Sequence, residues 1–599
     1  MRKIVLITLM TAVAMILNAT NEFHGQWYLL ATGMPQGDMK MLMMVDCNSH
    51  PPIVSITNPI KPSEMVNLYD VKTEGKMLSG KMHVLGISLS ISLELTDDHN
   101  AVGKLDGRFN LKASKSKFFK MDIDNGGNKL AATEIQKATI TLNYAMKGRM
   151  PHPERYNNVA STEVLDRSDA NFMNEVGLHA TVCRVWAGIG FVDEMGFELA
   201  NQMSDYLMVS YDYYKTDKRE QVKHELATLK QRFPKLRYVE VSNELDYNQS
   251  KGITADKYYA IYKSMNEIVN EVNKELKSAI PLEIGGPVSS NLNTVWLERF
   301  LDDYAADIWK DKRLDFISYH GYFAMSSDMN NRLFYKDNPS LAADQRDYIT
   351  TQLAKRGLWK ETPVFVSELG IYPGPLADDY NSMSDDQLRN AAGMASLLYW
   401  YTQSDNIYPM NWVLRHPTEG RKDQLVSHDK DGKNIACTHH LTPYGNMMMM
   451  MSKMKNNRIT AVCSVPQKNG KGIYAQASMD ELGISVMLWN FQSKGTTGYD
   501  VTLCLGKIPV ELRGKEVKIT TYIIDSKTCN HNYDLATSNL HPKENKCTML
   551  KDSEQLKVTL SPNAIMLITI EQRRSAFSSP TSQAHRMRQS RLRRVTGDN

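Results

Sequence analysis

The sequence predicts a multidomain protein in which an α/β barrel, the (β/α)8 TIM barrel, lies between a small N-terminal antiparallel β-domain and a C-terminal β-sandwich. At 599 residues the chain is too long for one compact core, so several domains are expected. Short apolar runs alternate with helical segments through its middle, which is typical of a parallel sheet covered by helices. On both sides of this region, apolar and polar residues alternate over short runs, which favours antiparallel strands.

Residues 1–20 have the order of a signal peptide. Met1, Arg2 and Lys3 precede the apolar run 4–17, and small or polar residues follow it. A buried N-terminal strand or helix is the alternative for the same run. No later segment approaches the roughly 20 uninterrupted apolar residues of a transmembrane helix. We therefore expect a secreted or periplasmic protein without a transmembrane segment.

Residues 21–118 predict the N-terminal β-domain. Alternating runs at 40–45, 80–95 and 103–114 are separated by Gly, Pro and Asn. This domain could bind glycan, contact a membrane-associated partner or shield the barrel, and the sequence leaves these roles open.

Residues 137–455 predict the barrel, with 137–150 as a possible strand of the later sandwich. Eight strand-like runs occur at 156–161, 180–188, 206–212, 237–245, 282–288, 315–322, 363–370 and 410–416. Helical segments between them include 219–232, 255–277, 293–307, 341–356 and 385–403. Eight such units predict a closed barrel. An open doubly wound sheet is the rival fold, but no Gly-x-Gly-x-x-Gly follows the first strand.

Residues 456–572 return to short alternating runs and predict the β-sandwich. Before it, the helical segment 445–454 contains five consecutive methionines, and these cover every face of a helix. We expect them to fill a core. Residues 573–599 are rich in Ser, Gln and Arg without hydrophobic periodicity, and this basic tail is predicted to be disordered.

The charge and cysteine content point to no further class of partner. The formal charge of +4 comes from the tail, whose seven Arg and one Asp leave −2 for the rest of the chain. No nucleic-acid partner is therefore expected. The seven cysteines lack any close metal-type pairing. Cys529 and Cys547 could close a loop in an oxidising compartment, and buried free thiols are the alternative.

Polar residues gather where the predicted barrel strands end. The active sites of such barrels lie at the C-terminal ends of the strands, because the loops that follow converge on one rim. The residues at these ends are Arg184 and Trp186 on the second strand, Asn243 and Glu244 on the fourth, His320 and Tyr322 on the sixth, Glu368 on the seventh and Trp412 on the eighth.

Two of these residues, Glu244 and Glu368, suggest a specific reaction. The fourth and seventh strands face one another across the mouth of an eight-stranded barrel. A retaining glycosidase needs two carboxyl groups about 5–5.5 Å apart, one as nucleophile and one as proton donor. Any single glutamate at a strand end is more often a cap or an ion-pair partner, but the joint placement favours a catalytic pair.

The same residues resemble a known group of enzymes. "VSNEL" at 241–245 and "VSELG" at 366–370 are similar to the paired signatures of clan A retaining glycoside hydrolases. "IGGPV" at 284–288, "SYHGYF" at 318–323 and the following β-sandwich most resemble family 39, which contains β-xylosidases and α-L-iduronidases. The resemblance covers roughly 137–572. Ser242 and Leu245 stand where the clan commonly has Trp and Pro, and "SELG" lacks a following Trp.

The resemblance implies roles for the rim residues. Glu368 would be the nucleophile and Glu244 the acid/base, with a pKa raised by the nearby charge of Glu368. Asn243 would bind the sugar 2-hydroxyl.

The remaining rim residues have supporting roles in the same interpretation. Arg184 and Tyr322 would keep the nucleophile ionised and oriented, although a structural ion pair and a packed ring are the alternatives. Trp412 would form a flat floor for the sugar, or pack in the core. Trp186 is also predicted to bind the substrate. His320 would contact the sugar or a carboxylate, and a buried hydrogen-bonded histidine would have the same sequence signal.

The predicted activity is retaining hydrolysis of an oligo- or polysaccharide, possibly β-xylosidase-like, without a metal or cofactor. A catalytically inactive carbohydrate-binding barrel is the alternative. A metal-dependent barrel hydrolase is disfavoured, because the first strand lacks His-x-His. The sugar, its anomer, exo or endo action and the oligomeric state remain open.

Overall fold

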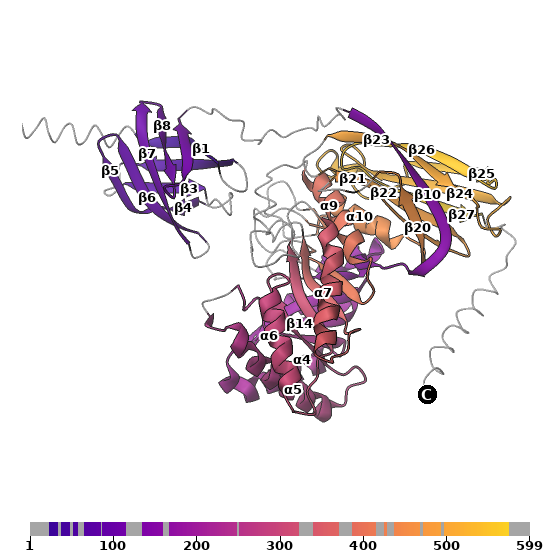
Figure 1. Cartoon of the computed structure of the whole chain (residues 1–599), viewed down its shortest axis with the longest axis horizontal. Helices are drawn as coiled ribbons and strands as arrows, with labels where there is room; N and C mark the ends of the chain where they lie inside the picture. Colours follow the sequence, from indigo (N-terminus) through magenta and orange to yellow (C-terminus); the bar gives the residue numbers. More distant parts are fainter. Residues whose placement is uncertain are drawn as a thin grey trace, which may run out of the picture.

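In the part of the chain that the computed structural model describes, the strands form three sheets of nine strands each (Figure 1). It describes residues 23–33, 38–47, 52–57, 65–84, 87–115, 134–159, 167–247, 251–322, 339–370, 386–414, 424–427, 437–465, 467, 471–492 and 496–573. The predicted signal peptide and almost all of the predicted basic tail lie outside these residues.

The first sheet is antiparallel and follows the chain in order. Its strands are β1 (Gly25–Thr32), β2 (Met39–Asp46), β3 (Ile53–Thr57), β4 (Met65–Asn67), β5 (Tyr69–Glu74), β6 (Met77–Val84), β7 (Ile87–Asp97), β8 (Asn100–Leu105) and β9 (Phe109–Ser114). β1 pairs with both β2 and β9, and the two edges of the sheet are β4 and β5. Only Leu68 separates these edge strands, so the sheet closes on itself. Its interior is apolar, with Trp27, Leu29 and Leu93 fully buried.

The second sheet is the predicted (β/α)8 barrel. Its parallel strands are β11 (Tyr156–Asn158), β12 (Ala180–Gly188), β14 (Ser204–Asp212), β15 (Leu236–Val241), β16 (Glu283–Ser289), β17 (Phe316–Tyr322), β18 (Val364–Gly370) and β19 (Ile407–Asn411). The ring closes where β11 pairs with β19, through Asn157 and Asn411. A short strand, β13 (Phe191–Val192), folds back on β12. The fold class predicted from the sequence is confirmed.

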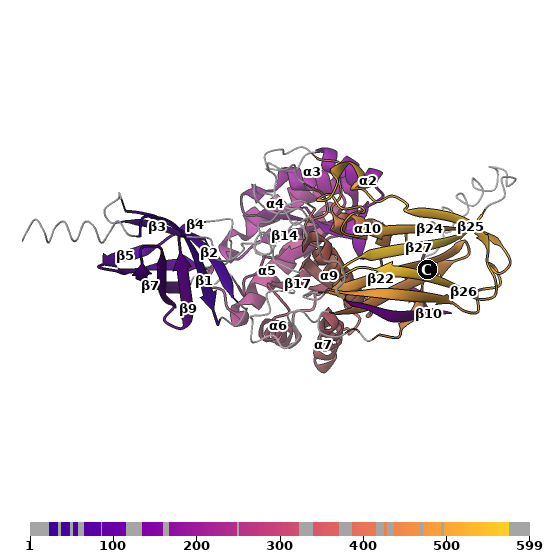
Figure 2. The same ribbon diagram turned by 90° about the horizontal axis from the view of Figure 1, so that it is seen from above.

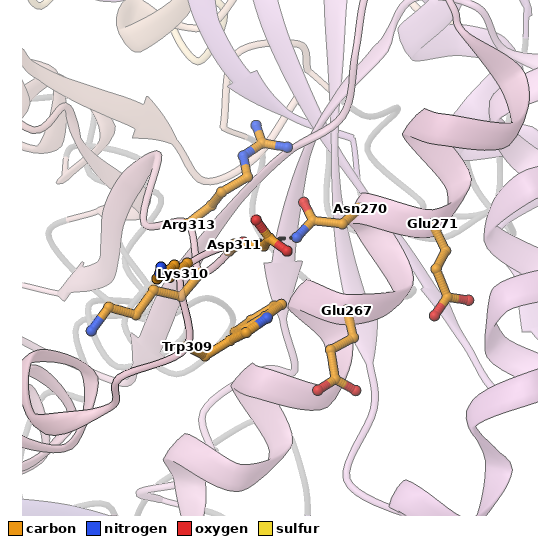
Figure 3. A pocket seen from close by; sticks show the side chains of 8 residues that line it. Glu267, Asn270, Glu271, Trp309, Lys310, Asp311 and Arg313 are labelled. Atoms are coloured by element: carbon orange, nitrogen blue, oxygen red, sulfur yellow. Dashed lines mark hydrogen bonds between the residues drawn. The ribbon is translucent and has the colours of Figure 1, made fainter.

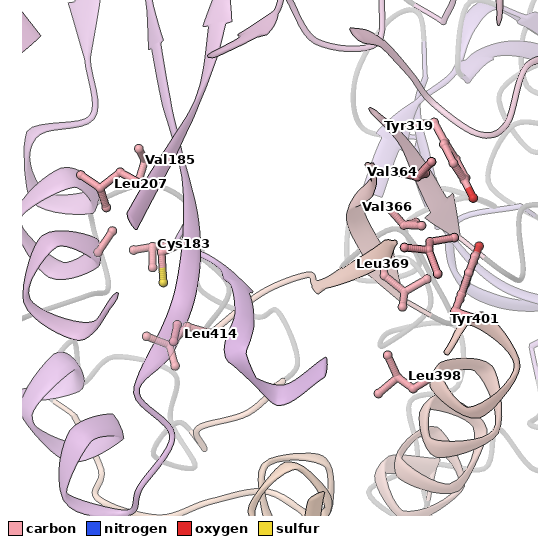
Figure 4. Close-up of a cluster of buried hydrophobic side chains, with 14 of the residues drawn as sticks. Cys183, Val185, Leu207, Tyr319, Val364, Val366, Leu369, Leu398, Tyr401 and Leu414 are labelled. Atoms are coloured by element: carbon pink, nitrogen blue, oxygen red, sulfur yellow. The ribbon is translucent and has the colours of Figure 1, made fainter. Parts of the chain in front are cut away.

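Helices surround this ring and share a core with its outer face. They are α2 (Arg167–Glu175), α3 (Glu194–Met203), α4 (Arg219–Arg232), α5 (Ala255–Leu276), α6 (Thr294–Ala306), α7 (Ala342–Lys355) and α9 (Asp386–Tyr401). Figure 4 shows Val364 and Leu369 of β18 beside Leu398 and Tyr401 of α9, all of them buried. α2 and α3 were not among the predicted segments, because polar residues interrupt the apolar pattern of α2 and Gly196 interrupts that of α3.

The inside of the barrel has an apolar lower layer and a polar layer above it. Val182, Met208, Phe316, Phe365 and Met410 pack together inside the ring. Two residues further along these strands, the inward positions become polar and remain fully buried. They are Arg184, Ser210, Glu240 and Ser318, together with Ser367 and Asn158. This layer lies directly beneath the C-terminal rim.

The third sheet is mixed and curls as one continuous sheet (Figure 2). It contains β10 (Glu134–Arg149), β20 (Asn457–Cys463), β21 (Lys471–Asp480), β22 (Gly483–Gln492), β23 (Thr497–Leu505), β24 (Glu516–Ile524), β25 (Glu544–Met549), β26 (Glu554–Leu560) and β27 (Ile565–Gln572). β10, which precedes the barrel in the chain, lies between β20 and β23. The barrel therefore connects two strands of the same sheet.

The barrel and the third sheet share a buried contact. The helix α10 (Pro443–Ser452) contains the five methionines, all of which are buried, so the prediction that they fill a core is confirmed. From α9, Ser396 accepts a hydrogen bond from the Trp489 indole at 2.8 Å. Tyr474 stacks on Trp489 with an interplanar angle of 6°.

Two further predictions concern disulfide bonds and membrane-spanning helices. None of the seven cysteines, all of which are among the described residues, is in a disulfide bond, and these include Cys529 and Cys547. Among the described residues, the helices are too short or too polar to cross a membrane.

Candidate active site

The turn after β15 presents Asn243 and Glu244. The strand ends at Val241, and both Ser242 (φ 68°) and Glu244 (φ 46°) adopt left-handed conformations. Such conformations are uncommon for residues other than Gly and often occur at functional sites. The amide of Ser242 donates to the Tyr211 carbonyl at 2.8 Å, and that of Glu244 donates to the Val288 carbonyl at 2.9 Å. Neighbouring strands therefore hold the turn.

Register shifts direct the side chains of β17 and β18. The pairing between these strands shifts between Tyr319 and His320, so that His320 lies opposite Glu368. A second shift separates Val366 from Leu369 in the pairing with β19. Shifts of this kind change the direction of nearby side chains. Here the Glu368 carboxylate lies beside Glu244 of the turn after β15.

Glu244 and Glu368 come together at the mouth of the barrel. A carboxylate oxygen of each lies within 4.8 Å of the other, and both lie within that distance of a His320 ring nitrogen. Inverting glycosidases separate their two carboxyl groups by about 6.5–9.5 Å to admit a water molecule, whereas retaining enzymes bring them to about 5–5.5 Å. The separation here agrees with the retaining arrangement.

Arg184 lies at the centre of the charged cluster. Its Nη1 donates to Glu368 Oε1 at 2.7 Å, its Nη2 to Asn243 Oδ1 at 2.7 Å, and its Nε to Glu240 Oε2 at 2.5 Å. Burial acts to lower the pKa of Arg184, but the charges of Glu240 and Glu368 outweigh it and raise that pKa. The guanidinium therefore remains charged and fixes two acidic side chains and one amide.

His320 and Glu244 form a close hydrogen-bonded pair of 2.5 Å between Nδ1 and Oε1. Burial acts to raise the pKa of Glu244, but His320 and Arg184 outweigh it and lower that pKa. Burial acts to lower the pKa of His320, but Glu368 and Glu244 outweigh it and raise that pKa. The sequence-based expectation of a raised pKa for Glu244 is therefore wrong for the free protein. Both directions favour the charged forms of the two side chains, an imidazolium beside a carboxylate.

Three aromatic side chains complete the predicted set. The Tyr322 hydroxyl donates to Glu368 Oε2. The Trp412 and Trp186 rings meet edge to face, with centroids 5.3 Å apart. The Arg184 guanidinium carbon lies 4.5 Å from the centroid of the Trp186 ring, which places Trp186 as a support for that cation.

All eight sequence-predicted residues thus belong to one contiguous cluster. They differ in access to solvent, since the Glu244 side chain is 25% exposed and that of Glu368 only 7%. A ligand entering the mouth would therefore meet Glu244 at the open side. Asp246 lies apart from the pair, because it accepts hydrogen bonds from Ser290 and Asn293 and fixes the next loop.

Two further residues of the cluster were missed from the sequence. Asn158 Oδ1 accepts from Arg184 Nη1 at 3.3 Å, and its Nδ2 donates to the Ser367 carbonyl at 2.9 Å. Glu240 pairs with Arg184 from below. A signal for Glu240 was present, because a charged residue at an inward position of a buried barrel strand requires a partner.

The three groups of Glu244, His320 and Glu368 have a spacing that could hold a metal ion. The Arg184 cation already lies 2.7 Å from Glu368, so it would oppose a second cation there by electrostatic repulsion. This donor set therefore fits an anion–cation network better than a metal centre.

The opposite end of the barrel carries a separate surface hollow of about 490 Å³. Figure 3 shows Trp309 and Glu267 on its walls, and its other side chains come from α5 and the segment before β17. That segment enters β17 at its N-terminal end, whereas the predicted residues lie at the C-terminal ends. The hollow contains none of them.

Comparisons with known proteins show the fold. No protein-family model matches the sequence, and no curated protein matches it. Among solved structures, a bacterial orthologue of human α-L-iduronidase is similar at 11% identity, covering 73% of this chain and 84% of that one, with a TM-score of 0.54.

Two other solved structures are similar over almost their whole length. A monomeric β-xylosidase from Caulobacter crescentus is 12% identical, covering 73% of this chain and 100% of its own, with a TM-score of 0.53. A glycoside hydrolase family 39 enzyme from Xanthomonas axonopodis is 12% identical, covering 74% and 99%, with a TM-score of 0.51. The chain therefore shares its fold with these glycosidases.

Proposed function

We propose that this protein is a retaining glycoside hydrolase that cleaves O-glycosidic bonds of an oligo- or polysaccharide by double displacement. The observation that carries the proposal is the approach of a Glu244 oxygen to within 4.8 Å of a Glu368 oxygen at the barrel mouth. This separation suits one nucleophile and one proton donor on either side of a scissile bond.

In the first step, a Glu368 oxygen bonds to the anomeric carbon as the bond from that carbon to the leaving oxygen breaks. The leaving oxygen takes the bonding electrons and a proton from Glu244. In the second step, Glu244 removes a proton from water, the water oxygen bonds to the anomeric carbon, and Glu368 leaves as a carboxylate. The substrate and product have the same anomeric configuration.

The neighbours of the pair support these roles. His320 Nδ1 lies 2.5 Å from Glu244 Oε1, so a proton on this nitrogen would reach Glu244 along the hydrogen bond and protonate it for the first step. Arg184 and Tyr322 both donate to Glu368 and keep it oriented. Arg184 also donates a hydrogen bond to the side-chain oxygen of Asn243, so that the amide NH2 of Asn243 can donate to a sugar hydroxyl.

The aromatic rings of the site support a sugar as the substrate. Trp412 and Trp186 offer apolar rings beside the charged cluster, an arrangement suited to a sugar ring with an apolar face and polar edges. A pentose-containing chain, as for a β-xylosidase, is the expectation from resemblance.

A panel of aryl glycosides tests the proposal. The wild type should hydrolyse at least one nitrophenyl glycoside, and Glu368→Ala and Glu244→Ala should lose most of this activity. Azide should rescue both variants on the dinitrophenyl glycoside of that sugar. It replaces the nucleophile in Glu368→Ala and gives the inverted azide. In Glu244→Ala it attacks the glycosyl-enzyme and gives the retained azide.

Glu154→Gln is a matched control, because Glu154 is a buried carboxylate of the same barrel that pairs with His152 away from the site. It should keep wild-type rates. Identical azide anomers from the two variants would contradict the assigned roles. Sugar binding without turnover, equal in the wild type and both variants, would instead indicate a carbohydrate-binding protein.

We also propose that the protein is exported, on the basis of the charged and apolar order of residues 1–20. N-terminal sequencing of the protein recovered after expression in a bacterium should show that this segment has been removed. An intact Met1 on protein found only in the cytoplasm would contradict export.

A further inference from the structure

Glu240 is a buried acid that the double displacement does not use. It lies on β15, four residues before Glu244, and its side chain has no exposed surface. Its Oε2 accepts from Arg184 Nε at 2.5 Å, whereas its Oε1 has no hydrogen-bond partner among the described residues. Burying a carboxylate is unfavourable unless it is paired, so Glu240 depends on Arg184.

Arg184 is therefore shared between two carboxylates, of which only one takes part in the proposed reaction. Glu368 contacts Nη1 from the rim, and Glu240 contacts Nε from the layer below. In the proposed reaction Glu368 becomes a neutral ester, while Glu240 reaches no substrate. Of the two carboxylates that hydrogen-bond to the guanidinium, only Glu240 then remains unesterified.

The charge balance changes as the glycosyl-enzyme forms. In the free protein, Arg184 faces two anions. When the Glu368 charge is lost to the bond with the anomeric carbon, Arg184 still faces Glu240. Without Glu240, the same step would leave the fully buried Arg184 side chain with no carboxylate in hydrogen-bond contact, and removing the partner of a buried charge is strongly destabilising.

We propose that Glu240 is a positioning residue that keeps Arg184 paired throughout the catalytic cycle and thereby stabilises the glycosyl-enzyme and the transition state that leads to it. This inference rests on the proposed function. It assigns to Glu240 an effect on the first chemical step that differs from its effect on the second, since the second step returns the charge to Glu368.

Glu240→Gln tests this asymmetry, because it keeps the size of the side chain and removes its charge. The probe is the 2-deoxy-2-fluoro glycosyl fluoride of the sugar that the wild type hydrolyses fastest in the aryl glycoside panel. This probe forms a slowly hydrolysed glycosyl-enzyme, and mass spectrometry of the intact protein follows its formation and its loss separately.

We expect the rate of labelling, and kcat/KM on the matching aryl glycoside, to fall about 100-fold in Glu240→Gln. The rate at which the label is lost should not decrease. Glu240→Asp keeps the charge and should recover part of the labelling rate, whereas the matched control Glu154→Gln should label as the wild type does. Equal slowing of labelling and loss, or equal defects in the Gln and Asp variants, would overturn the inference.

A measurement of stability tests the shared pairing without any turnover. In Glu240→Gln or Glu368→Gln alone, Arg184 keeps one anion, but in the double variant it keeps neither. The loss of unfolding free energy in the double variant should exceed the sum of the two single losses, and simple additivity would overturn the shared pairing. Failure of the proposed function is a different result, because the wild type itself would then turn over no glycoside.

Discussion

The two closed sheets of this chain are filled in opposite ways. The core of the N-terminal sheet, over the residues that the structure describes, is a cluster of apolar side chains in which Trp27, Leu29 and Leu93 are fully buried. The (β/α)8 barrel contains a comparable apolar layer, but above it lie Arg184 and Glu240, whose side chains are equally buried. The same protein thus has one barrel with an apolar filling and one with a buried ion pair.

This difference separates what folding needs from what the site needs. Apolar side chains suffice to fill a closed sheet, and a buried ion pair is often no more stabilising than apolar residues of similar volume. The charged layer lies directly below Glu368 and Asn243, both of which Arg184 contacts. Its position indicates that these charges serve the rim rather than the stability of the barrel.

Removing the buried cation of the barrel should have the largest effect. Arg184→Met leaves Glu240 and Glu368 without their cation and should lower the free energy of unfolding by about 3–5 kcal/mol. Aryl glycoside hydrolysis should fall by about 1,000-fold or more, because Glu368 and Asn243 lose their shared donor. Urea denaturation and kcat/KM measure the two effects. In Arg184→Met with Glu240→Leu, much of the stability should return without activity, and recovered activity would contradict a role for the charge.

The second test acts on the apolar side of the comparison. Leu29→Ala removes a fully buried side chain from the N-terminal sheet and should lower the stability of that sheet by about 2–5 kcal/mol. Because no site residue lies in this sheet, kcat/KM at a temperature where the variant is folded should stay within about twofold of the wild-type value. Calorimetry and the aryl glycoside assay provide both measurements. A large fall in kcat/KM would show that the two interiors are coupled.

A smaller effect is expected from the group that shares a proton with Glu244. His320→Gln removes the imidazole and should lower kcat/KM by about 100-fold with a glycoside that needs acid assistance. Since the pKa of His320 is raised, the pair should keep its proton above the ordinary histidine value of 6.5. The basic limb of the pH profile should therefore move to lower pH in the variant. An unchanged limb would show that His320 does not hold the proton.

The smallest predicted effect is the pH dependence of stability. The raised pKa of His320 gives a contribution that is complete below 6.5 and is lost as pH rises through the folded-state pKa. The lowered pKa of Glu244 gives a contribution that is complete above 4.5 and is lost as pH falls through its folded-state pKa.

The difference in unfolding free energy between the wild type and His320→Gln should therefore be larger at about pH 5.5 than at about pH 9. Glu368, Arg184 and Tyr322 also face His320, and all three are present in both proteins. A difference that is constant across this pH range would contradict the ion pair.

Much of the barrel could be predicted from the sequence, because the alternation of short apolar strands and helical segments is visible within each stretch of the chain. The helix predicted at 219–232 has the observed bounds, and the strand predicted at 180–188 does as well. The rim residues followed from the rule that barrel sites lie at strand ends. The turn at Ser242 and Glu244 did not, since its left-handed residues are held by β14 and β16 rather than by their own propensities.

The contacts that could not be predicted from the sequence are those between side chains from different strands inside the barrel. Glu240 and Arg184 are 56 positions apart, on β15 and β12, and they meet because both side chains point into the barrel from either side of β14. The pKa of Glu244 was misjudged for the same reason, because its direction depends on His320 from a strand 76 positions away. The closure of the N-terminal sheet likewise depends on Leu68, a single residue between two strands that lie outside the alternating runs identified in the sequence.

The position of β10 has a practical consequence for anyone who wishes to work with shorter versions of this protein. A fragment that stops after α10 would retain this 16-residue strand but lose both of its neighbours, β20 and β23. Without these neighbours, β10 would expose unpaired backbone amides and carbonyls, and such exposed edges promote self-association of the protein. Expression designs should therefore keep residues 134–573 as one indivisible piece.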